Sequence, residues 1–330
     1  MKKKILIVLT IVLVVALAMI SMVACNTKKD DSTIRIGALT GPTAIGILNL
    51  KNDVDTGANT GKYTFDLQSD ASVISASLVK GDLDIALVPC NVASKLYNNP
   101  NIDVKVIDIN ATNVLYCVTG ATSTIASIAD LNGKDVLVPN QGTMPDAVSK
   151  FLFNQYGITV NVTYSTPDAI KTSLVSDNTK IGILPQPAAI ASVVAASTTD
   201  NKLKLAFSLG EAWTSKVTDG SEVTTGVTIV RTAFLKDHES LVKQFLVDHK
   251  ASVEKATKDE ASIASTAELV VAAGILPKAP VAVKAIPLCG LACITGQDMK
   301  TKVSGCLTAL HSVIPDLTGN VPGDDFYYLG

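Results

Sequence analysis

The chain has little basic charge and few residues of the kinds that nucleic-acid and metal sites need. Its 330 residues include 28 Lys and Arg against 30 Asp and Glu, which gives a formal net charge of −2. A nucleic-acid-binding surface requires an excess of basic side chains, so a nucleic-acid partner is not expected. The 3 histidines, His238, His249 and His311, lie far from any paired cysteines, so no zinc-ligand spacing is present.

Short motifs of common enzymes are also missing. The chain contains no Gly-x-Ser-x-Gly elbow and no His-Glu-x-x-His pair. Residues 57–62 resemble a phosphate loop but have one spacer too few, and Tyr63 stands where Ser or Thr is needed, so a hairpin turn is expected. The sequence therefore predicts no catalytic residue, no metal and no cofactor, although a catalytic pair formed by tertiary contact would leave no such motif.

The N-terminus has the pattern of an export signal. Lysines at positions 2–4 precede an apolar run over 5–20, and Ser-Met-Val-Ala at 21–24 leads to Cys25. This is typical of a lipoprotein signal peptide, residues 1–24, whose removal leaves Cys25 as a lipidated first residue. The polar residues 25–33 are expected to form a tether. An uncleaved membrane anchor is the alternative, because about 20 apolar residues span a bilayer.

Export has consequences for charge, location and cysteine chemistry. Loss of residues 1–24 removes three lysines and lowers the formal net charge from −2 to −5. We expect the protein outside the cytoplasm, attached to the membrane through its N-terminal lipid without spanning it. The cysteines that remain are Cys90, Cys117, Cys289, Cys293 and Cys306. A disulfide from Cys289 to Cys293 or Cys306, and buried free thiols, are the alternatives.

From residue 33 onward, short β-rich runs alternate with helical stretches. Expected strands are 33–39, 63–68, 84–89, 114–120, 135–139, 162–165, 181–184, 202–209 and 224–235; expected helices are 43–51, 71–80, 91–98, 144–156, 168–176, 186–196, 238–257, 259–273 and 296–314. A strand followed by a crossover helix is the unit of a mostly parallel sheet, so the fold class is α/β.

The pattern occurs twice, which predicts two lobes. Two β-rich passages, 111–120 and 224–235, look like crossings between them. Residues 34–115 and 230–330 are therefore assigned to lobe 1 and residues 116–229 to lobe 2, each with its own core. A ligand site is expected in the cleft where helix N-termini of the two lobes face each other.

Five segments carry a family resemblance: the lipobox ending at Cys25, then residues 36–46, 78–89, 140–143 (Asn-Gln-Gly-Thr) and 184–187 (Leu-Pro-Gln-Pro). Their order and spacing resemble the solute-binding proteins of ABC importers with the type II periplasmic-binding-protein fold, in particular the nitrate, sulfonate and thiamine-precursor group. The resemblance covers essentially the whole mature chain. It implies a two-lobed fold, each lobe a mostly parallel sheet flanked by helices, that closes on a small-molecule solute and docks to an ABC permease, with ATP hydrolysed elsewhere.

Two alternatives stand beside a transport receptor: a ligand-sensing or adhesion surface lipoprotein, and a thiamine-precursor-type enzyme on the same fold. The mature chain has two arginines, Arg35 and Arg231, of which Arg231 is the candidate for reaching the cleft. Since amino-acid receptors commonly hold the α-carboxylate with Arg, an amino-acid solute is disfavoured. The low aromatic content does not indicate a sugar site of stacked rings. A small polar or anionic solute is expected.

Candidate solute contacts lie in loops that follow predicted strands and begin helices. In lobe 1 they are Thr40, Gly41, Pro42 and Thr43, and then Cys90 and Asn91; in lobe 2 they are Gln141, Gly142, Thr143, Pro185 and Gln186, with Tyr116 on the first crossing. The plainer interpretations are helix capping for the loop residues and core packing for Tyr116. Trp213, the single tryptophan, is expected either to line the cleft or to cover an edge of the core.

Overall fold

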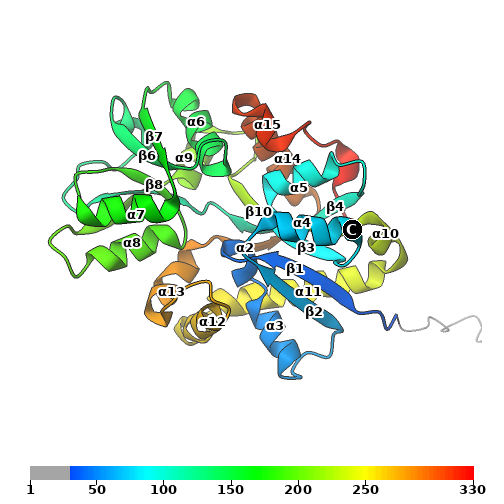
Figure 1. Cartoon of the computed structure of the whole chain (residues 1–330). Helices are drawn as coiled ribbons and strands as arrows, with labels where there is room; N and C mark the ends of the chain where they lie inside the picture. Colours follow the sequence, from blue (N-terminus) through cyan, green and yellow to red (C-terminus); the bar gives the residue numbers. More distant parts are fainter. Residues whose placement is uncertain (1–29) are drawn as a thin grey trace, which may run out of the picture. The chain divides into compact units, whose positions relative to one another are not determined.

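The computed structural model describes residues 30–330 as a mixed α/β fold with two β-sheets (Figure 1). The predicted signal peptide, residues 1–24, and the predicted lipidation site Cys25 lie outside the described residues. Of the predicted tether, residues 30–33 form neither helix nor strand. Within residues 30–330, no helix combines the length and the apolar character needed to cross a membrane.

Sheet A has six strands in the order β11-β4-β10-β3-β1-β2. They are β1 (Ile34–Leu39), β2 (Tyr63–Gln68), β3 (Ile85–Pro89), β4 (Val104–Thr112), β10 (Thr224–Arg231) and β11 (Leu291–Ile294). β1 pairs in parallel with β2 and β3, whereas β10 is antiparallel to β3 and β4, and β11 is antiparallel to β4. Segments from the first and last parts of the described chain therefore build one sheet.

Sheet B has five strands in the order β7-β6-β8-β5-β9. They are β5 (Leu115–Gly120), β6 (Asp135–Pro139), β7 (Asn161–Ser165), β8 (Gly182–Pro185) and β9 (Leu203–Ser208). β6 is parallel to β7 and β8, and β5 is antiparallel to β8 and β9. Each sheet is thus mixed: β1 pairs in parallel with β2 and β3, and β6 with β7 and β8, whereas the antiparallel pairs involve β5 in sheet B and β10 and β11 in sheet A.

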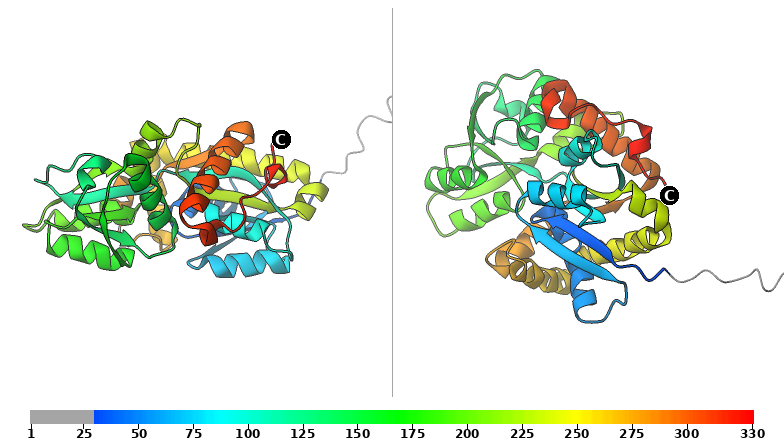
Figure 2. Two further views of the ribbon diagram at one scale, coloured as in Figure 1. Left: turned by 90° about the horizontal axis from the view of Figure 1, so that it is seen from above. Right: turned by 45° about the vertical axis from the view of Figure 1, so that its right-hand side comes forward.

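Helices cover both faces of each sheet. They are α2 (Pro42–Ile45), α3 (Leu48–Asp55), α4 (Ala71–Lys80), α5 (Cys90–Tyr97), α6 (Met144–Tyr156), α7 (Pro167–Ser176), α8 (Ala188–Ala196), α9 (Leu209–Lys216), α10 (Thr232–Asp237), α11 (Glu239–Thr257), α12 (Glu260–Ala272), α13 (Ala279–Ala285), α14 (Gly296–Val313) and α15 (Pro315–Thr318), with short 3-10 turns at Ile128–Leu131, Ile286–Leu288 and Asp324–Phe326. Figure 1 shows α7 and α8 side by side along sheet B. Figure 2 shows α14, from the C-terminal part of the chain, next to α5.

Neighbouring side chains along a strand pack on different helices. In sheet A, Leu87 packs with α2, α3 and α11, whereas Val88 packs with α4, α5 and α14. In sheet B, Leu184 packs with α7 and α8, and Ile183 with α6 and α9. Because successive side chains of a strand point to opposite faces, this pattern is that of sheets buried on both sides.

The apolar core continues from one sheet to the other. One cluster of buried side chains includes Val227 of β10, Met299 of α14, Phe151 of α6 and Trp213 of α9. This cluster spans both sheets because α14 packs on α6, whereas two smaller clusters each belong to one sheet, and the expectation of a separate core in each lobe stays a prediction. Trp213 is fully buried with its ring centroid 4.5 Å from that of Phe151, so it belongs to this core.

Strand pairing places the return to sheet A earlier than expected. The sequence sets the return to lobe 1 at residue 230, within the predicted crossing 224–235, but β10 already pairs with β4 at Thr224 and with β3 at Gly226. Residues 224–229 therefore lie in the sheet that the first part of the chain builds. The remaining division, with 34–115 in lobe 1 and 116 onward in lobe 2, stays a prediction.

Most predicted elements occur within a few residues of their expected bounds, and the exceptions have physical causes. The helix expected over 43–51 is two helices, α2 and α3, separated at Gly46. β4 is not predicted, because Asp108 and Asn110 interrupt its apolar pattern although both are buried. The β-rich stretch 224–235 ends as a strand at Arg231, where α10 follows. Residues 57–62 connect α3 to β2 and form no hairpin.

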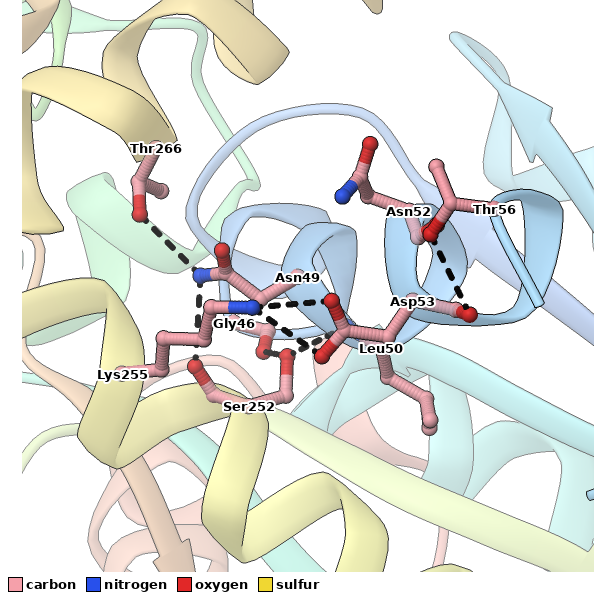
Figure 3. Close-up of polar contacts among 9 residues, drawn as sticks. All are labelled: Gly46, Asn49, Leu50, Asn52, Asp53, Thr56, Ser252, Lys255 and Thr266. Carbon is pink, nitrogen blue, oxygen red and sulfur yellow. Dashed lines mark hydrogen bonds and ion pairs between the residues drawn. The ribbon is translucent and has the colours of Figure 1, made fainter. Parts of the chain in front are cut away.

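Buried hydrogen bonds fasten α11 and α12 to the segment between α2 and α3 (Figure 3). The Ser252 hydroxyl donates to the Gly46 carbonyl at 2.6 Å and accepts from the Leu50 amide at 3.0 Å. Asn49 Nδ2 donates to Thr266 Oγ1 at 3.0 Å. Ser252 thus satisfies backbone groups at the break between the two helices, which fixes the segment after β1 relative to α11, and the Asn49 side chain joins α3 to α12.

All five cysteines of the described part of the chain are free thiols. Cys293 is half-buried, and the other four are buried. The disulfide alternative is therefore not present in this structure, and the four buried thiols pack as small apolar side chains.

Candidate functional site

The two sheets are joined where the carboxyl ends of their strands come together. β4 ends at Thr112, and residues 113–114 lead directly into β5. Because β5 runs antiparallel to β8, its first residue, Leu115, pairs with the last residue of β8, Pro185. β10 begins beside the end of β4, with Thr224 opposite Thr112. The carboxyl ends of β4 and β8 thus meet at residues 113–114, which we call the interlobe link.

Backbone hydrogen bonds hold the interlobe link from both sides. The Asn113 amide donates to the Val223 carbonyl at 2.9 Å, and the Gln186 amide donates to the Val114 carbonyl at 2.8 Å. Asn113 has a φ of 53°, a conformation that Asn adopts more readily than most residues. The loop after β8 and the segment before β10 are therefore fixed to the same short piece of chain.

Four buried polar atoms near the interlobe link have no hydrogen-bond partner in the protein. They are Asn110 Oδ1, Asn113 Oδ1, Thr225 Oγ1 and Gln186 Nε2. Leaving such an atom unsatisfied costs about 1–3 kcal/mol, so it normally bonds to protein, water or a ligand. Three of these atoms come from the sheet A side and one from the loop after β8, so both sheets contribute.

Asn110 and Thr43 converge at Gly226. Asn110 is fully buried, and its Nδ2 donates to Thr228 Oγ1 at 3.2 Å. A Cβ at position 226 would overlap both Asn110 Oδ1 and Thr43 Cγ2. Glycine therefore lets a side chain from the end of β4 and one from the helix after β1 meet over the start of β10.

The loop over residues 40–43 follows β1, but most of its polar groups are already bonded. Thr43 is buried and its hydroxyl donates to the Leu39 carbonyl at 2.5 Å, while the Thr40 amide donates to the end of β2. Gly41, with a φ of 123°, precedes α2, which Pro42 begins and which is a single turn long. The solute contacts expected of Thr40, Gly41, Pro42 and Thr43 stay predictions.

The loop after β3 places Cys90 inside the core. Cys90 is fully buried, and burial raises the pKa of its thiol well above the ordinary value. A neutral, enclosed thiol packs as a small apolar group, so we leave the Cys90 side chain out of the candidate site. Asn91, the next residue of α5, is half-buried, and its contact with a solute stays a prediction.

The loop before α6 already binds a carboxylate of its own chain. The Gly142 amide donates to Asp146 Oδ2 at 2.9 Å, and the Tyr164 hydroxyl donates to Asp146 Oδ1 at 2.8 Å. The Thr143 hydroxyl donates to a carbonyl of the preceding turn at 2.6 Å. The helix end expected to attract an anion is therefore occupied by Asp146. Solute contacts of Gln141, Gly142 and Thr143 stay predictions.

Pro185, Gln186 and Tyr116 lie at the interlobe link. Gln186 is 1% exposed; its Oε1 accepts from the Ile190 amide at 3.3 Å, and its Nε2 is one of the unpaired atoms. Tyr116, near the start of β5, is half-buried, and burial, followed by nearby Glu211, raises the pKa of its hydroxyl. Tyr116 is therefore a neutral hydrogen-bonding group at physiological pH, and its contact with a solute stays a prediction.

Neither arginine reaches the interlobe link. Arg35 donates from Nε and Nη2 to the Asp84 carboxylate at 2.9 and 2.6 Å, and Arg231 Nη2 donates to it at 3.0 Å. Burial alone would raise the pKa of Asp84, but the hydrogen bonds from both arginines hold it below the usual value. Asp84 precedes β3, so this cluster lies at the amino end of β3, whereas the interlobe link lies at the carboxyl end of β4 and the start of β10. The interpretation that Arg231 reaches the site is wrong, and the described residues offer no arginine for a carboxylate clamp.

The carboxylate of Glu222 lies next to the interlobe link, and it is paired. Glu222 Oε2 accepts from Asn113 Nδ2 at 3.1 Å, and Glu222 Oε1 lies 3.0 Å from Lys302 Nζ. Glu222 therefore orients the Asn113 amide, and Lys302 balances its charge.

Sequence reasoning missed Asn110, Asn113 and Thr225. A signal for the first two was available: in Asp-Ile-Asn-Ala-Thr-Asn at 108–113, polar residues at 108, 110 and 112 alternate with apolar ones, and Asn113 follows. This alternation is typical of a strand with one polar face, and polar groups at a strand's carboxyl end are candidates for ligand contact. No comparable signal marks Thr225.

Comparison with solved structures shows which proteins share this fold. An ABC transporter protein from Parabacteroides distasonis has a TM-score of 0.73 and 19% identity, covering 90% of this chain and 99% of its own. The periplasmic aliphatic sulphonate binding protein SsuA from Escherichia coli has a TM-score of 0.69 and 13% identity, covering 90% and 96%. The alkanesulfonate-binding protein SsuA from Xanthomonas axonopodis pv. citri, bound to MOPS, has a TM-score of 0.61 and 12% identity, covering 90% and 98%.

In sequence, no protein-family model matches the chain, and no curated protein matches it either. The likeness to the solved structures is therefore one of fold, and it extends over nine-tenths of the chain. The chain therefore has the α/β fold of these solved structures, with two β-sheets flanked by helices, and the fold class agrees with the one that the family resemblance implies.

Proposed function

We propose that this chain is the extracytoplasmic, lipid-anchored solute-binding component of an ABC importer and that it binds a small polar solute at the interlobe link. The fold it shares with the sulphonate-binding proteins supports the class of function. The lipobox before Cys25 supports the anchor. The partner would be an ABC permease in the membrane, which receives the solute, and no cofactor is needed.

The set of unpaired polar atoms at the interlobe link carries this proposal. Asn110 Oδ1, Asn113 Oδ1 and Gln186 Nε2 belong to residues whose other polar atoms are bonded to the protein. Each amide is therefore held in place and still has one group to offer. A ligand that bonds to groups from both sheets would favour their approach, which is how a two-lobed receptor couples binding to closure.

The groups at the link favour a solute that is recognised through neutral hydrogen bonds. Amide oxygens accept, amide nitrogens donate, and the Tyr116 hydroxyl does both. The positive end of α6 is occupied by Asp146, and both arginines are bound to Asp84. Of the polar and anionic solutes that the sequence allows, we therefore favour a polar solute with both donors and acceptors.

A melting screen tests solute binding. The full-length chain, purified in detergent, is heated with neutral polar metabolites, pyrimidines, vitamins, sulfonates and inorganic anions in turn. A solute at about 100 times its Kd stabilises the fold by about 2.7 kcal/mol, which shifts the melting temperature by several degrees. Mass spectrometry of solute released by heating identifies cargo that co-purifies.

Two variants locate the site. Gln186→Ala and Asn113→Ala each remove a group at the link and should weaken binding of the identified solute at least about 10-fold, since a buried hydrogen bond contributes about 1–3 kcal/mol. Gln244→Ala is the matched control, because Gln244 is exposed on α11 and bonds only to Asp248 of its own helix among the described residues. If the screen shifts nothing and no solute co-purifies, or if Gln186→Ala binds normally, the proposed site is wrong.

The anchor is tested separately. Cleavage and lipidation should leave an N-terminal peptide that begins at Cys25 and carries the mass of its acyl chains, as measured by mass spectrometry of the membrane fraction. Cys25→Ser should abolish that modification. An unmodified N-terminal peptide that retains residues 1–24 in the wild-type chain would support the uncleaved membrane anchor.

A further inference from the structure

A second polar cluster lies deeper in sheet A. Thr228 Oγ1 of β10 donates to Asp108 Oδ1 of β4 at 2.8 Å, and His249 Nδ1 of α11 lies 3.1 Å from Asp108 Oδ2. Cys293 of β11 is next to them: one donor atom each from Asp108, His249 and Cys293 lies within 4.8 Å of the other two. Three elements that are far apart in the sequence thus bring an acid, an imidazole and a thiol together.

This cluster has little to balance its carboxylate. Asp108 and His249 are both 0% exposed, and among the described residues His249 is the one basic side chain within ion-pair distance of Asp108. His249 Nε2 is buried without any hydrogen-bond partner. A carboxylate taken out of water is costly unless a cation or several donors compensate it, so the place favours a positive ion.

We propose that Asp108, His249 and Cys293 bind one divalent transition-metal ion, with zinc the favoured occupant. Thiolate, imidazole and carboxylate are the ligands zinc takes in proteins, at about 2.0–2.3 Å. Ligands of a tetrahedral ion at those distances lie about 3.3–3.8 Å apart, so the donors here need to move by about 1 Å. Binding releases the Cys293 thiol proton to solvent, and the thiolate and carboxylate then balance the charge of Zn²⁺.

The surroundings allow an ion to enter and hold the ligands once it is bound. Cys293 is half-buried, and its thiol lies 3.8 Å from the Leu246 carbonyl. A surface pocket is lined in part by Ile107, which precedes Asp108 in the chain, and by Leu246, whose carbonyl the Cys293 thiol contacts. His249 is one turn from Ser252, whose hydrogen bonds fix α11. A bound ion would therefore tie α11, β4 and β11 together and stiffen the sheet that carries Asn110.

Cobalt titration tests the site without any solute, so its outcome is independent of the proposed function. The full-length chain in detergent is treated with a chelator, dialysed and titrated with Co²⁺. We expect one Co²⁺ per chain, a thiolate-to-cobalt charge-transfer band in the near ultraviolet, and displacement by Zn²⁺. Cys293→Ser should remove the band and weaken Co²⁺ binding at least about 100-fold, and Asp108→Asn should weaken it at least about 10-fold.

Cys306→Ser is the matched control, because Cys306 is a buried free thiol outside the cluster and should leave the band unchanged. A second measurement, the melting temperature, shows whether each variant is folded and whether Zn²⁺ stabilises it. Zn²⁺ should raise the melting temperature of the wild type and of Cys306→Ser but not of His249→Gln. Absence of the charge-transfer band in the wild type, its persistence in Cys293→Ser, or an equal Zn²⁺ shift in His249→Gln would overturn the proposal.

Discussion

Replacing Asp84 with Asn should destabilise the fold and leave solute binding intact. The buried Asp84 carboxylate accepts hydrogen bonds from the Arg35 amide and guanidinium and from the Arg231 guanidinium. Asn keeps the shape, but it has no charge and turns one acceptor into a donor that faces an arginine. This cluster lies at the ends of the sheet A strands that are opposite the interlobe link. The substitution should therefore leave the geometry of the proposed site unchanged.

The magnitude follows from the burial of the three partners. Breaking a buried ion pair costs about 3–5 kcal/mol, and a hydrogen bond to a charged group contributes about 1.5–3 kcal/mol. The side chains of Arg35 and Arg231 are 42% and 26% exposed, so water replaces part of the interaction that they lose with the Asp84 carboxylate. We expect the free energy of unfolding to fall by about 2–4 kcal/mol and the melting temperature by about 5–10 °C.

The effect should depend on pH with a defined sign. The pKa of Asp84 is lower in the folded protein than in the unfolded chain, because the arginine hydrogen bonds outweigh the cost of burial. Its stabilisation is therefore fully present above the unfolded pKa of about 3.9 and is lost as the pH falls through the folded pKa. The difference in unfolding free energy between wild type and Asp84→Asn should be constant from about pH 7 to about pH 5 and shrink below about pH 4.

Urea unfolding of the full-length chain at about pH 7, 5 and 3.5 measures this difference, and the melting screen measures solute binding. Asp168→Asn is the control: Asp168 is 89% exposed and pairs with Lys171, so its loss should change stability by less than about 1 kcal/mol. A difference that is unchanged at about pH 3.5, or a loss of solute binding in Asp84→Asn, would refute this account of the arginine cluster.

Three further predictions concern packing and thiol chemistry. Gly290→Ala should lower the unfolding free energy by about 3 kcal/mol or more in thermal melts, because a Cβ at its φ of 54° would overlap the Thr112 carbonyl; a normal melting temperature would contradict this. Trp213→Phe removes the Nε1 hydrogen bond to Ser221 Oγ, 3.1 Å long, along with buried volume, and should cost about 1–3 kcal/mol in urea unfolding. Burial raises the pKa of Cys117 to about 12, so iodoacetamide at about pH 8 should alkylate it only after denaturation, as mass spectrometry of its peptide would show.

Local signals made much of the fold predictable. The helix expected over 144–156 is present as α6 with those bounds, because Pro145 favours a helix start and Gly157 ends the helix in a left-handed conformation. The strand expected over 84–89 is present as β3, Ile85–Pro89, an unbroken apolar run that is buried on both faces. β4 escaped prediction because its polar residues are paired with Thr228 and His249, partners that a single strand's sequence does not reveal.

The candidate site was less predictable, since it depends on which partner each polar group finds. Loops at helix starts were correctly expected to lie at strand ends, but the Gly142 amide is taken by Asp146 of its own helix. Conversely, the unpaired Oδ1 of Asn113 becomes recognisable only when the fold forms the interlobe link, to which the Gln186 amide also bonds. Sequence patterns indicate where polar groups lie, and tertiary structure decides which of them are left to bind something else.

The pairing of both arginines with Asp84 has a consequence for where such a receptor can work. If solute recognition rests on amides and hydroxyls, the attraction acts only at contact and is hardly screened by salt. A site with a net charge attracts ionic solutes from a distance, but salt screens this attraction beyond a Debye length of about 8 Å at physiological ionic strength. Such a site would also attract other ions that compete with the solute. Under the proposed function, the affinity of the chain for its solute should therefore vary little with the salinity of the surroundings.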